Sequence, residues 1–217
     1  MTGAAAAAAN SKAASQAIHR YLVLGSASPR RRELLARIGV TPHAIIPADI
    51  DETPHCDELP TQYVARMARE KAAAVRLPAD SDSATHYWTL AGDTVVAAGR
   101  RILPKTEDEA AARQCLELLS GRRHRVLSAI AVRAPDGRTL NRTSTTIVRF
   151  KRLTSGEIDG YIASGEWCGK AGGYAIQGYA EAFVVHLSGS HSGVVGLPLL
   201  ETRNLLISSG YLSAGPA

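Results

Sequence analysis

The sequence predicts an α/β fold built on a mixed sheet. Short apolar runs that suit buried strands alternate with segments that carry helix-start signals, and two adjacent strand-like runs are joined by a tight turn. A crossover helix between two strands places them parallel, whereas a tight turn places them antiparallel, so the sheet should contain both kinds of pairing. The 217 residues suffice for one large domain, or for two lobes that share a core.

Strands and helices alternate in the first half of the chain. We expect, in order, a strand at 21–24, a helix at 29–38, an extended run at 43–47, a helix at 61–76 and a central strand at 89–98. Pro29 suits the first turn of the first helix, where a backbone N–H would have no partner, and Gly39 suits its end. The central strand is apolar almost throughout, which is typical of a buried strand.

The second half supplies a hairpin and three more helices. After a turn at 99–101 we expect a helix at 106–119, strands at 125–133 and 139–151, a helix at 154–163, a glycine-rich loop at 165–178, a strand near 183–185 and a helix at 198–207. Thr106 with Glu109, and Thr154 with Glu157, match the capping box that opens many helices. The turn at 134–137 (APDG) joins the two strands of the hairpin.

The two ends of the chain are set apart from the expected domain. Residues 1–19 contain a polyalanine run and no acidic residue, and we expect a disordered extension there. A transit peptide is the alternative, because such peptides also lack acidic residues, although arginine is absent before Arg20. Residues 20–210 should form a single domain, followed by a tail at 211–217.

The composition indicates a folded protein with anionic partners. Hydrophobic residues make up 45% of the chain and the net charge is +5. No run approaches the roughly 18 apolar residues that a membrane span requires. The charge suits a nucleotide pocket, a nucleic-acid surface or merely a solvated exterior. The three cysteines are widely spaced and form no CxxC pair, so we expect a reducing compartment, the cytoplasm.

Three arginines stand where a helix normally favours negative charge. Arg30, Arg31 and Arg32 occupy the first turn of the helix that begins at Pro29. Each cation there is disfavoured by roughly 0.3–1 kcal/mol unless an anion binds beside it. Free backbone N–H groups, guanidinium groups and the hydroxyl of Ser26 together suit a phosphate. The alternative is that the side chains extend into solvent, which we expect for Arg32.

A lone carboxylate interrupts the expected central strand. Asp93 lies within the run LAGDTVVA at 90–97, and an ionised carboxylate in a buried strand is costly unless it is paired, hydrogen-bonded or metal-bound. Gly92 beside it removes side-chain bulk, which would let a ligand approach closely. The alternative is that Asp93 ends the strand and caps the following turn.

Four further polar residues each leave two interpretations open. Lys71 shares a helical face with apolar residues, so it either extends to solvent or reaches a cleft and supplies a charge for phosphate. Glu52 belongs either to a solvated acidic loop or to a site for a divalent cation. Lys105 could pair with Glu109, and Gln177 could be ordinary loop polarity, so neither indicates a site by itself.

Other common site patterns do not occur in the sequence. The segment GSASP at 25–29 has neither the glycine spacing nor the Gly-Lys ending of a P-loop, and there is no HExxH or GxSxG motif. Aromatic residues make up 5% of the chain and do not interleave with the basic residues, which argues against a stacking platform for single-stranded nucleic acid.

Six motifs along the chain occur in an order that is typical of one family. They are LGSASPRRRELL at 24–35, the acidic pair at 51–52, YVARMAREKA at 63–72, AGDTV at 91–95, KAGGYAIQG at 170–178 and GVVGLPLLE at 193–201. Together they resemble the Maf-like nucleotide pyrophosphatases, a family named for the inhibition of septum formation. The resemblance covers about residues 21–208 and leaves the N-terminal extension outside.

The resemblance implies an elongated α/β fold of two lobes around a central nucleotide-binding cleft. It also implies hydrolysis of a nucleoside triphosphate to the monophosphate and pyrophosphate, with Asp93 as the catalytic base and a divalent cation, Mg²⁺ or Mn²⁺, at Glu52 and Asp93. Substrate binding would fall to Ser26, Arg30, Arg31, Lys71, Thr94, Lys105 and Gln177. A cytoplasmic homodimer is expected, with no nucleic-acid or membrane partner.

Within the family, the sequence is similar to the subgroup that acts on dTTP and UTP. That subgroup has the residues found here as Arg30, Thr94 and Gln177, whereas the subgroup acting on 7-methyl-GTP has tryptophan, glutamine and glutamate there. A glutamine amide can both donate to and accept from a uracil-type edge. One departure is that Lys105 lies between proline and threonine, where the family usually has Glu-Lys-Pro, so a carboxylate that could assist the metal is absent.

Two alternatives stay open beside this prediction. The first is the same reaction on 7-methyl-GTP or another modified nucleotide. The second is a regulatory protein that inhibits septum formation by binding a partner or nucleic acid, with hydrolysis incidental. The resemblance also implies roles in nucleotide-pool sanitation and in cell-division arrest.

Overall fold

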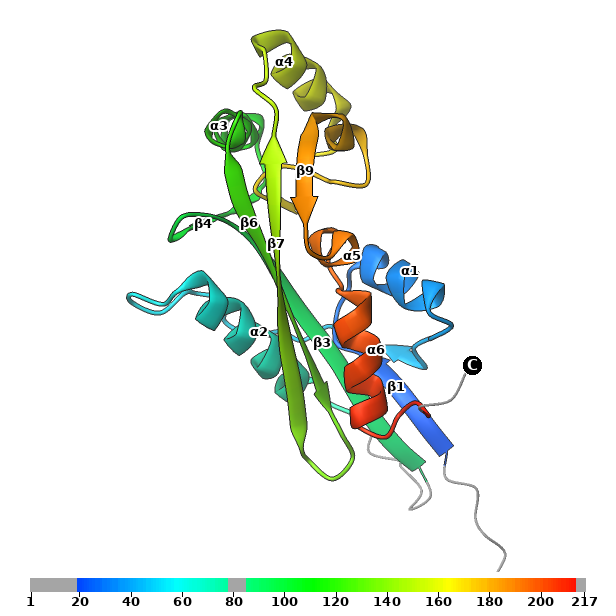
Figure 1. Ribbon diagram of the computed structural model, residues 1–217. Coiled ribbons are helices and arrows are strands. Elements are labelled where there is room, and N and C mark those ends of the chain that lie inside the picture. Colours follow the sequence, from blue (N-terminus) through cyan, green and yellow to red (C-terminus); the bar gives the residue numbers. More distant parts are fainter. Residues whose placement is uncertain (1–18, 78–84, 214–217) are drawn as a thin grey trace, which may run out of the picture.

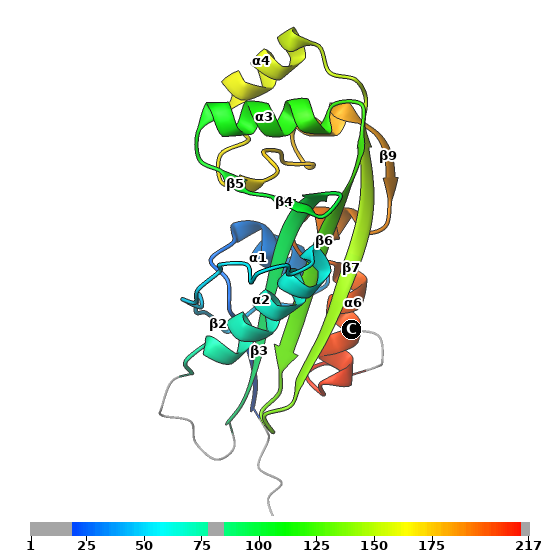
Figure 2. The same ribbon diagram turned by 90° about the vertical axis from the view of Figure 1, so that its left-hand side faces the viewer.

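The computed structural model describes residues 19–77 and 85–213 (Figure 1). The fold is mixed α/β, as the sequence predicts, and the molecule is elongated, with a lobe at each end of a long sheet (Figures 1 and 2). The expected N-terminal extension lies outside the described residues, except for His19, which belongs to the first strand. The end of the expected tail, 214–217, also lies outside them.

The main sheet contains both parallel and antiparallel pairs. In the described part of the chain it has seven strands, with β4 paired to β3 and the others in the order β2-β1-β3-β6-β7-β9. β1 is parallel to both of its neighbours, and the remaining pairs are antiparallel. The strands are β1 (His19–Leu24), β2 (Ala44–Ile45), β3 (Thr85–Ala98), β4 (Arg101–Leu103), β6 (Arg123–Arg133), β7 (Thr139–Phe150) and β9 (Val184–Ser188).

Helices cover both faces of this sheet and build the second lobe. In Figures 1 and 2, α2 lies on one face, α1, α5 and α6 lie on the other, and α3 and α4 form one end of the molecule. β5 (Lys105–Thr106) and β8 (Lys170–Ala171) pair beneath α3 as a small second sheet. The helices are α1 (Pro29–Arg37), α2 (Pro60–Ala74), α3 (Glu109–Leu119), α4 (Ser155–Ser164), the 3₁₀ helix η1 (Tyr179–Phe183), α5 (His191–Val195) and α6 (Leu199–Ser208).

Each lobe has its own apolar core, and the long strands β6 and β7 connect them. Phe150, Tyr161 and Phe183 are fully buried at the centre of the α3–α4 lobe. In the other lobe the sheet has one core against α1 and α6 and another against α2, where Met67 is fully buried. Because β3 and β6 belong to both lobes, residues in the middle of these strands lie between the two cores.

One predicted helix start is wrong and the other is confirmed. Thr106 does not cap α3; it lies in β5, where its buried hydroxyl donates to the carbonyl of Trp167 at 2.8 Å. Asp108 caps α3 instead, its carboxylate accepting a backbone N–H of the first turn at 2.8 Å. The capping box that begins at Thr154 is present at α4. The pairing of β5 with β8 places Thr106 in the small sheet, and no local pattern predicts that pairing.

A buried histidine contributes to the core of the α3–α4 lobe. The Nε2 atom of His124 lies 2.8 Å from the hydroxyl of Tyr174, and the imidazole packs edge-on against Phe150. Its Nδ1 atom has no hydrogen-bond partner among the described residues. Burial lowers the pKa of His124 from 6.5 to about 4, because the protonated ring would be desolvated there.

Replacing His124 should therefore make the free energy of unfolding less sensitive to acid. Between about pH 6.5 and pH 4 the unfolded chain holds a proton on His124 that the folded protein does not, so the free energy of unfolding falls as pH falls through that window. In His124→Gln, the free energy of unfolding should fall by roughly 2 kcal/mol less between pH 7 and pH 5 than it does in the wild type, as measured by urea unfolding. The matched control is His186→Gln on the exposed face of β9, which should leave the slope unchanged; an unchanged slope in His124→Gln contradicts the assignment.

Candidate active site

A cavity lies at the point where the connections of the parallel strands diverge. β1 is flanked by β2 on one side and β3 on the other, so the chain that leaves β1 goes first to one side and later returns on the other. Ligands of α/β sheets commonly bind outside the carboxyl ends of the strands at such a position. Here the last bond of the β1–β3 ladder joins the N–H of Gly25 to the carbonyl of Leu90 at 2.8 Å, and the cavity of about 370 Å³ begins beyond it.

The residues that the sequence predicts for the site come together at this cavity. Both lobes contribute to its wall, and the segment after β1, the acidic turn before α2, α2 itself, β3, β5 and the glycine-rich loop all reach it. The predicted residues among the lining are Ser26, Arg30, Arg31, Glu52, Lys71, Asp93, Thr94, Lys105 and Gln177. The roles that the resemblance assigns to them stay predictions.

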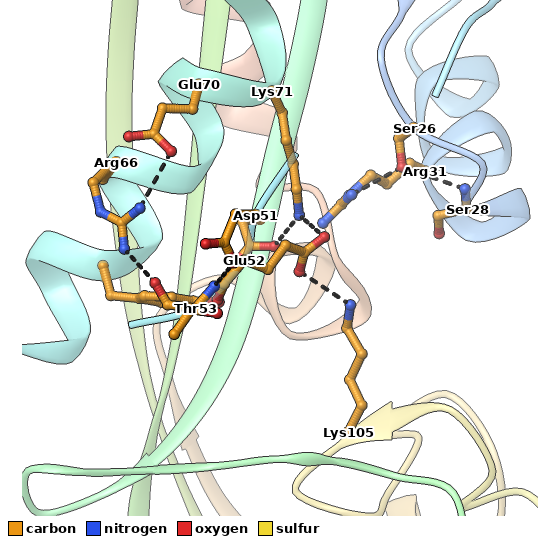
Figure 3. Close-up of polar contacts among 12 residues, drawn as sticks. Ser26, Ser28, Arg31, Asp51, Glu52, Thr53, Arg66, Glu70, Lys71 and Lys105 are labelled. Atoms are coloured by element: carbon orange, nitrogen blue, oxygen red, sulfur yellow. Dashed lines mark hydrogen bonds and ion pairs between the residues drawn. The ribbon is translucent and has the colours of Figure 1, made fainter. Parts of the chain in front are cut away.

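The segment after β1 presents cations and free donors to the cavity. Arg31 donates from its guanidinium to the hydroxyl oxygen of Ser26 at 2.9 Å (Figure 3). It also donates to the carbonyl of Gly196 at 2.9 Å. The N-cap Ser28 makes no side-chain capping bond, and no acid occupies the first turn of α1. The N-terminal N–H groups and both arginines are thus available to an anion. Arg32 is exposed, as predicted.

Burial makes these arginines costly in the absence of an anion. Both side chains are half-buried, and desolvation lowers the pKa of Arg30 and of Arg31. At Arg31 the charge of Asp93 opposes this shift, and the charge of Arg30 adds to it. A guanidinium whose charged form is disfavoured by its surroundings gains more from an anionic ligand than one in free solvent does. The electrostatics of this segment therefore favour a phosphate.

Asp93 is buried within β3 and is neutralised by a lysine from α2. The strand continues to Ala98, so Asp93 does not end it, and its side chain is 7% exposed. The Nζ atom of Lys71, whose side chain is 9% exposed, donates to the Oδ1 atom of Asp93 at 2.8 Å. Both alternatives left by the sequence, a capping aspartate and a solvent-directed lysine, are thereby wrong.

Gly92 has a different role from the one expected. A Cβ atom at this position would lie 2.9 Å from the backbone oxygen of Ala129 and 3.3 Å from the side chain of Ile130, both in β6. The missing side chain thus permits close pairing of β3 with β6 rather than the approach of a ligand. The prediction that Gly92 makes room for a ligand is therefore wrong.

A second carboxylate bridges two lysines at the mouth of the cavity. Glu52 accepts from the Nζ of Lys71 at 2.9 Å and from the Nζ of Lys105 at 3.5 Å (Figure 3). Burial alone would raise the pKa of Glu52, but the hydrogen bonds and charges of the two lysines together lower it. Lys105 thus pairs with Glu52 rather than with Glu109, the partner that sequence spacing suggested.

Side chains of α2 hold the acidic turn in place. The hydroxyl of Tyr63 donates to the backbone carbonyl of Glu52 at 2.8 Å, and Arg66 donates to the carbonyl of Thr53 at 3.1 Å. Arg66 also donates twice to the carboxylate of Glu58, at 2.7 and 2.8 Å, and these bonds lower the pKa of Glu58 to about 2. The position of Glu52 is therefore fixed from the same helix that carries Lys71.

Two residues that the sequence analysis did not single out contribute to the site. Lys170 of β8 lines the cavity opposite α1; desolvation and then the charge of Arg30 lower its pKa. Ser128 of β6 lies directly across from Thr94 in the β3–β6 register, and their hydroxyl oxygens are 2.9 Å apart. Lys170 begins one of the six family motifs, whereas no local pattern marks Ser128, because strand register is not visible in the sequence.

The lining has an excess of positive charge. Among the described residues, five basic side chains (Arg30, Arg31, Lys71, Lys105 and Lys170) face two carboxylates (Glu52 and Asp93), an excess of three positive charges. No group of three or more His, Cys, Asp or Glu side chains in the described residues could hold a metal ion by itself. Mg²⁺ commonly uses one or two carboxylates together with substrate phosphates, and Glu52 and Asp93 fit that pattern because both contact the same lysine nitrogen.

Comparison with a family model places the chain in a known group. The model described as "Maf-like protein" matches residues 21–209. The chain belongs to the Maf-like family. A protein from Zymomonas mobilis named dTTP/UTP pyrophosphatase is 61% identical over 190 residues, which cover 88% of this chain and 92% of the relative. One of the same name from Rhodospirillum rubrum is 60% identical over 192 residues, 88% of each chain.

The similarity to solved structures is weaker than that to the named relatives. A HAM1 protein from Coxiella burnetii has 16% sequence identity and a TM-score of 0.47, covering 91% of this chain and all of that one (100%).

In the described part of this Maf-like protein, every helix is too short or too polar to cross a bilayer.

The ion pair between Lys71 and Asp93 should dominate the stability of the site. Lys71→Met leaves the carboxylate of Asp93 buried without a cation, and we expect the free energy of unfolding to fall by about 3 kcal/mol in urea titrations at pH 7. Adding Asp93→Asn should restore part of the loss, because the uncompensated charge is then removed.

The matched control is the lysine at the other end of Glu52. Lys105→Met removes a side chain that is 58% exposed, so its effect on the same measurement should stay within about 0.5 kcal/mol. If Lys71→Met and Lys105→Met destabilise equally, the Lys71–Asp93 pair is not the buried neutralising contact described above.

Proposed function

We propose that this Maf-like protein hydrolyses dTTP and UTP to the monophosphate and pyrophosphate. The proposal rests most heavily on one observation: a buried carboxylate, Asp93, stands in a cavity whose other charged groups are mostly cations placed to bind phosphates. Relatives about 60% identical over most of the chain carry the name of this activity, which favours the same assignment.

In the proposed complex, the triphosphate occupies the cationic part of the cavity. Arg30, Arg31 and the N-terminus of α1 bind phosphate oxygens from one side, and Lys71 and Lys105 bind them from the other. Binding replaces water around the phosphates with fixed donors, which stabilises the charge that moves toward the leaving group. Positioning and charge stabilisation therefore supply most of the rate enhancement.

Asp93 acts on the attacking water. Its carboxylate accepts a proton while the water oxygen forms a bond to the α-phosphorus, and the bond between that phosphorus and the oxygen bridging to the β-phosphate breaks. The electron pair of the broken bond leaves with pyrophosphate. Lys71 holds a positive charge 2.8 Å from the Oδ1 atom of Asp93 and so fixes the position of the carboxylate before substrate arrives.

We propose a divalent cation, Mg²⁺ or Mn²⁺, as the cofactor. Glu52 and Asp93 would hold it together with the substrate phosphates, and when bound it would neutralise phosphate charge. The homodimer and the cytoplasmic location implied by the family resemblance are carried forward as predictions, and size-exclusion chromatography with light scattering tests the first. The proposal includes no nucleic-acid or membrane partner.

The base would be selected at Thr94 and Gln177, with Arg30 nearby. Thr94 and Gln177 reach the cavity from β3 and from the glycine-rich loop of the other lobe. A glutamine amide offers both a donor and an acceptor to a uracil-type edge. A panel of kcat/KM values for dTTP, UTP and 7-methyl-GTP, each with Mg²⁺ and with Mn²⁺, tests this preference; a higher value for 7-methyl-GTP would overturn it.

The catalytic assignment is tested by an isosteric substitution. Asp93→Asn removes the proton acceptor, and we expect the rate of pyrophosphate release from UTP to fall by at least about 100-fold, as for loss of a general base. Asp159→Asn is the matched control, since that carboxylate is 60% exposed on α4 and pairs with Arg113 away from the cavity. Near wild-type release by Asp93→Asn would sink the assignment.

A further inference from the structure

A short chain of hydroxyl groups connects the cavity wall to the interior of the sheet. The hydroxyl oxygen of Thr94 lies 2.9 Å from that of Ser128, and the hydroxyl of Ser128 donates to the carbonyl of Gly193 in α5 at 2.5 Å. Thr94 lines the cavity, whereas Ser128 is 1% exposed and does not. The chain thus runs from a proposed substrate contact to a residue that no substrate reaches.

The direction of the bond between Ser128 and Gly193 is fixed by chemistry. A carbonyl oxygen can only accept, so the single hydroxyl proton of Ser128 lies toward Gly193. Gly193 is buried near the end of α5, where backbone carbonyls lack partners within the helix. Leaving that carbonyl without a donor would be unfavourable, so the proton of Ser128 is not available to Thr94.

The direction of the next bond follows from the first. Because the Ser128 hydroxyl donates its hydrogen bond to the carbonyl of Gly193, the Ser128 oxygen can only accept at its contact with Thr94. Thr94 is therefore the donor in that contact. The other acceptor near Thr94 is the carbonyl of Gly196, but it is farther, at 3.5 Å, and already accepts from Arg31 at 2.9 Å. With its one proton directed to Ser128, the Thr94 oxygen retains only acceptor capacity for a ligand.

We propose that Ser128 is a positioning residue for base selection, because it holds the Thr94 hydroxyl as a hydrogen-bond acceptor at the cavity wall. An acceptor there favours a base that presents an N–H group, as uracil and thymine do at N3, over cytosine, whose N3 is itself an acceptor. With cytosine, the Thr94 oxygen and the N3 atom would both be acceptors, and neither would have a hydrogen-bond donor. A buried site that hydrogen-bonds one ligand discriminates strongly against another that leaves its polar groups unpaired. This inference rests on the proposed function and adds that the Thr94 hydroxyl distinguishes bases by the group they present at N3.

Replacing Ser128 should change the nucleotide preference more than the rate. In Ser128→Ala the Thr94 proton loses its acceptor, so the hydroxyl is free to rotate and donate to a ligand. We expect the ratio of kcat/KM for UTP to that for CTP, measured by pyrophosphate release, to fall about tenfold, mainly through a higher KM for UTP. Ser128→Thr keeps the hydroxyl and should keep the ratio within about twofold of wild type.

Ser144→Ala is the matched control for loss of a buried serine hydroxyl. Ser144 lies opposite Ser128 on β7 and is also buried, at 9% exposed against 1% for Ser128, but it makes no hydrogen bond to Thr94 within the described structure. Its UTP:CTP ratio should equal that of the wild type. A purely structural role for Ser128 would lower kcat/KM for both nucleotides equally and leave the ratio unchanged, and that outcome overturns the proposal.

A second variant keeps the test informative if Ser128→Ala does not fold. Thr94→Val removes the acceptor itself with little change in shape, and it should lower the UTP:CTP ratio in the same direction, whereas an unchanged ratio overturns the proposal. Equal use of UTP and CTP by the wild type also overturns it while leaving pyrophosphate hydrolysis intact. Absence of pyrophosphate release from any nucleotide by the wild type is different, since it overturns the proposed function and the inference together.

Discussion

The site depends on a charge that the fold buries and then neutralises. Asp93 lies in the middle of β3 between two apolar cores, where an ionised carboxylate is unfavourable without a partner. Lys71 supplies the partner at 2.8 Å, and α2 can deliver it only because Met67 and Ala68 pack on the same face of the sheet. The same lysine nitrogen contacts Glu52 at 2.9 Å, so one residue sets the position of both carboxylates.

The open edge of β3 allows both of its faces to take part. β1 stops pairing with β3 at Leu24 and Leu90, so beyond Leu90 that edge of β3 borders the cavity, while the opposite edge stays paired with β6. Side chains alternate along a strand, which directs Asp93 toward α2 and its neighbour Thr94 toward α5. Two consecutive residues can therefore serve different ends of one ligand. In the proposed function, one acts at the phosphates and the other at the base.

The sequence predicts the parts of this site that depend on local physics. Arginines in the first turn of α1 and a carboxylate in an apolar run are each visible as local conflicts, and both line the cavity. Partner choice depends on tertiary packing and is not visible in this way: Lys71 could equally have reached solvent, and Ser128 meets Thr94 only through the β3–β6 register. Thr106 was misassigned for the same reason, because β5 pairs with a strand some sixty-five residues later in the chain.

The arrangement of charges also explains why a phosphate ligand and a divalent cation belong together in the proposed function. Lys71 already has two carboxylate partners, so a phosphate that approaches it meets Glu52 and Asp93 as well. Like charges brought this close in a partly buried site repel one another unless a cation lies between them. A divalent ion held by the two carboxylates together with the phosphates would remove the conflict, and Lys71 would then be a donor to substrate instead of the cation that both carboxylates share.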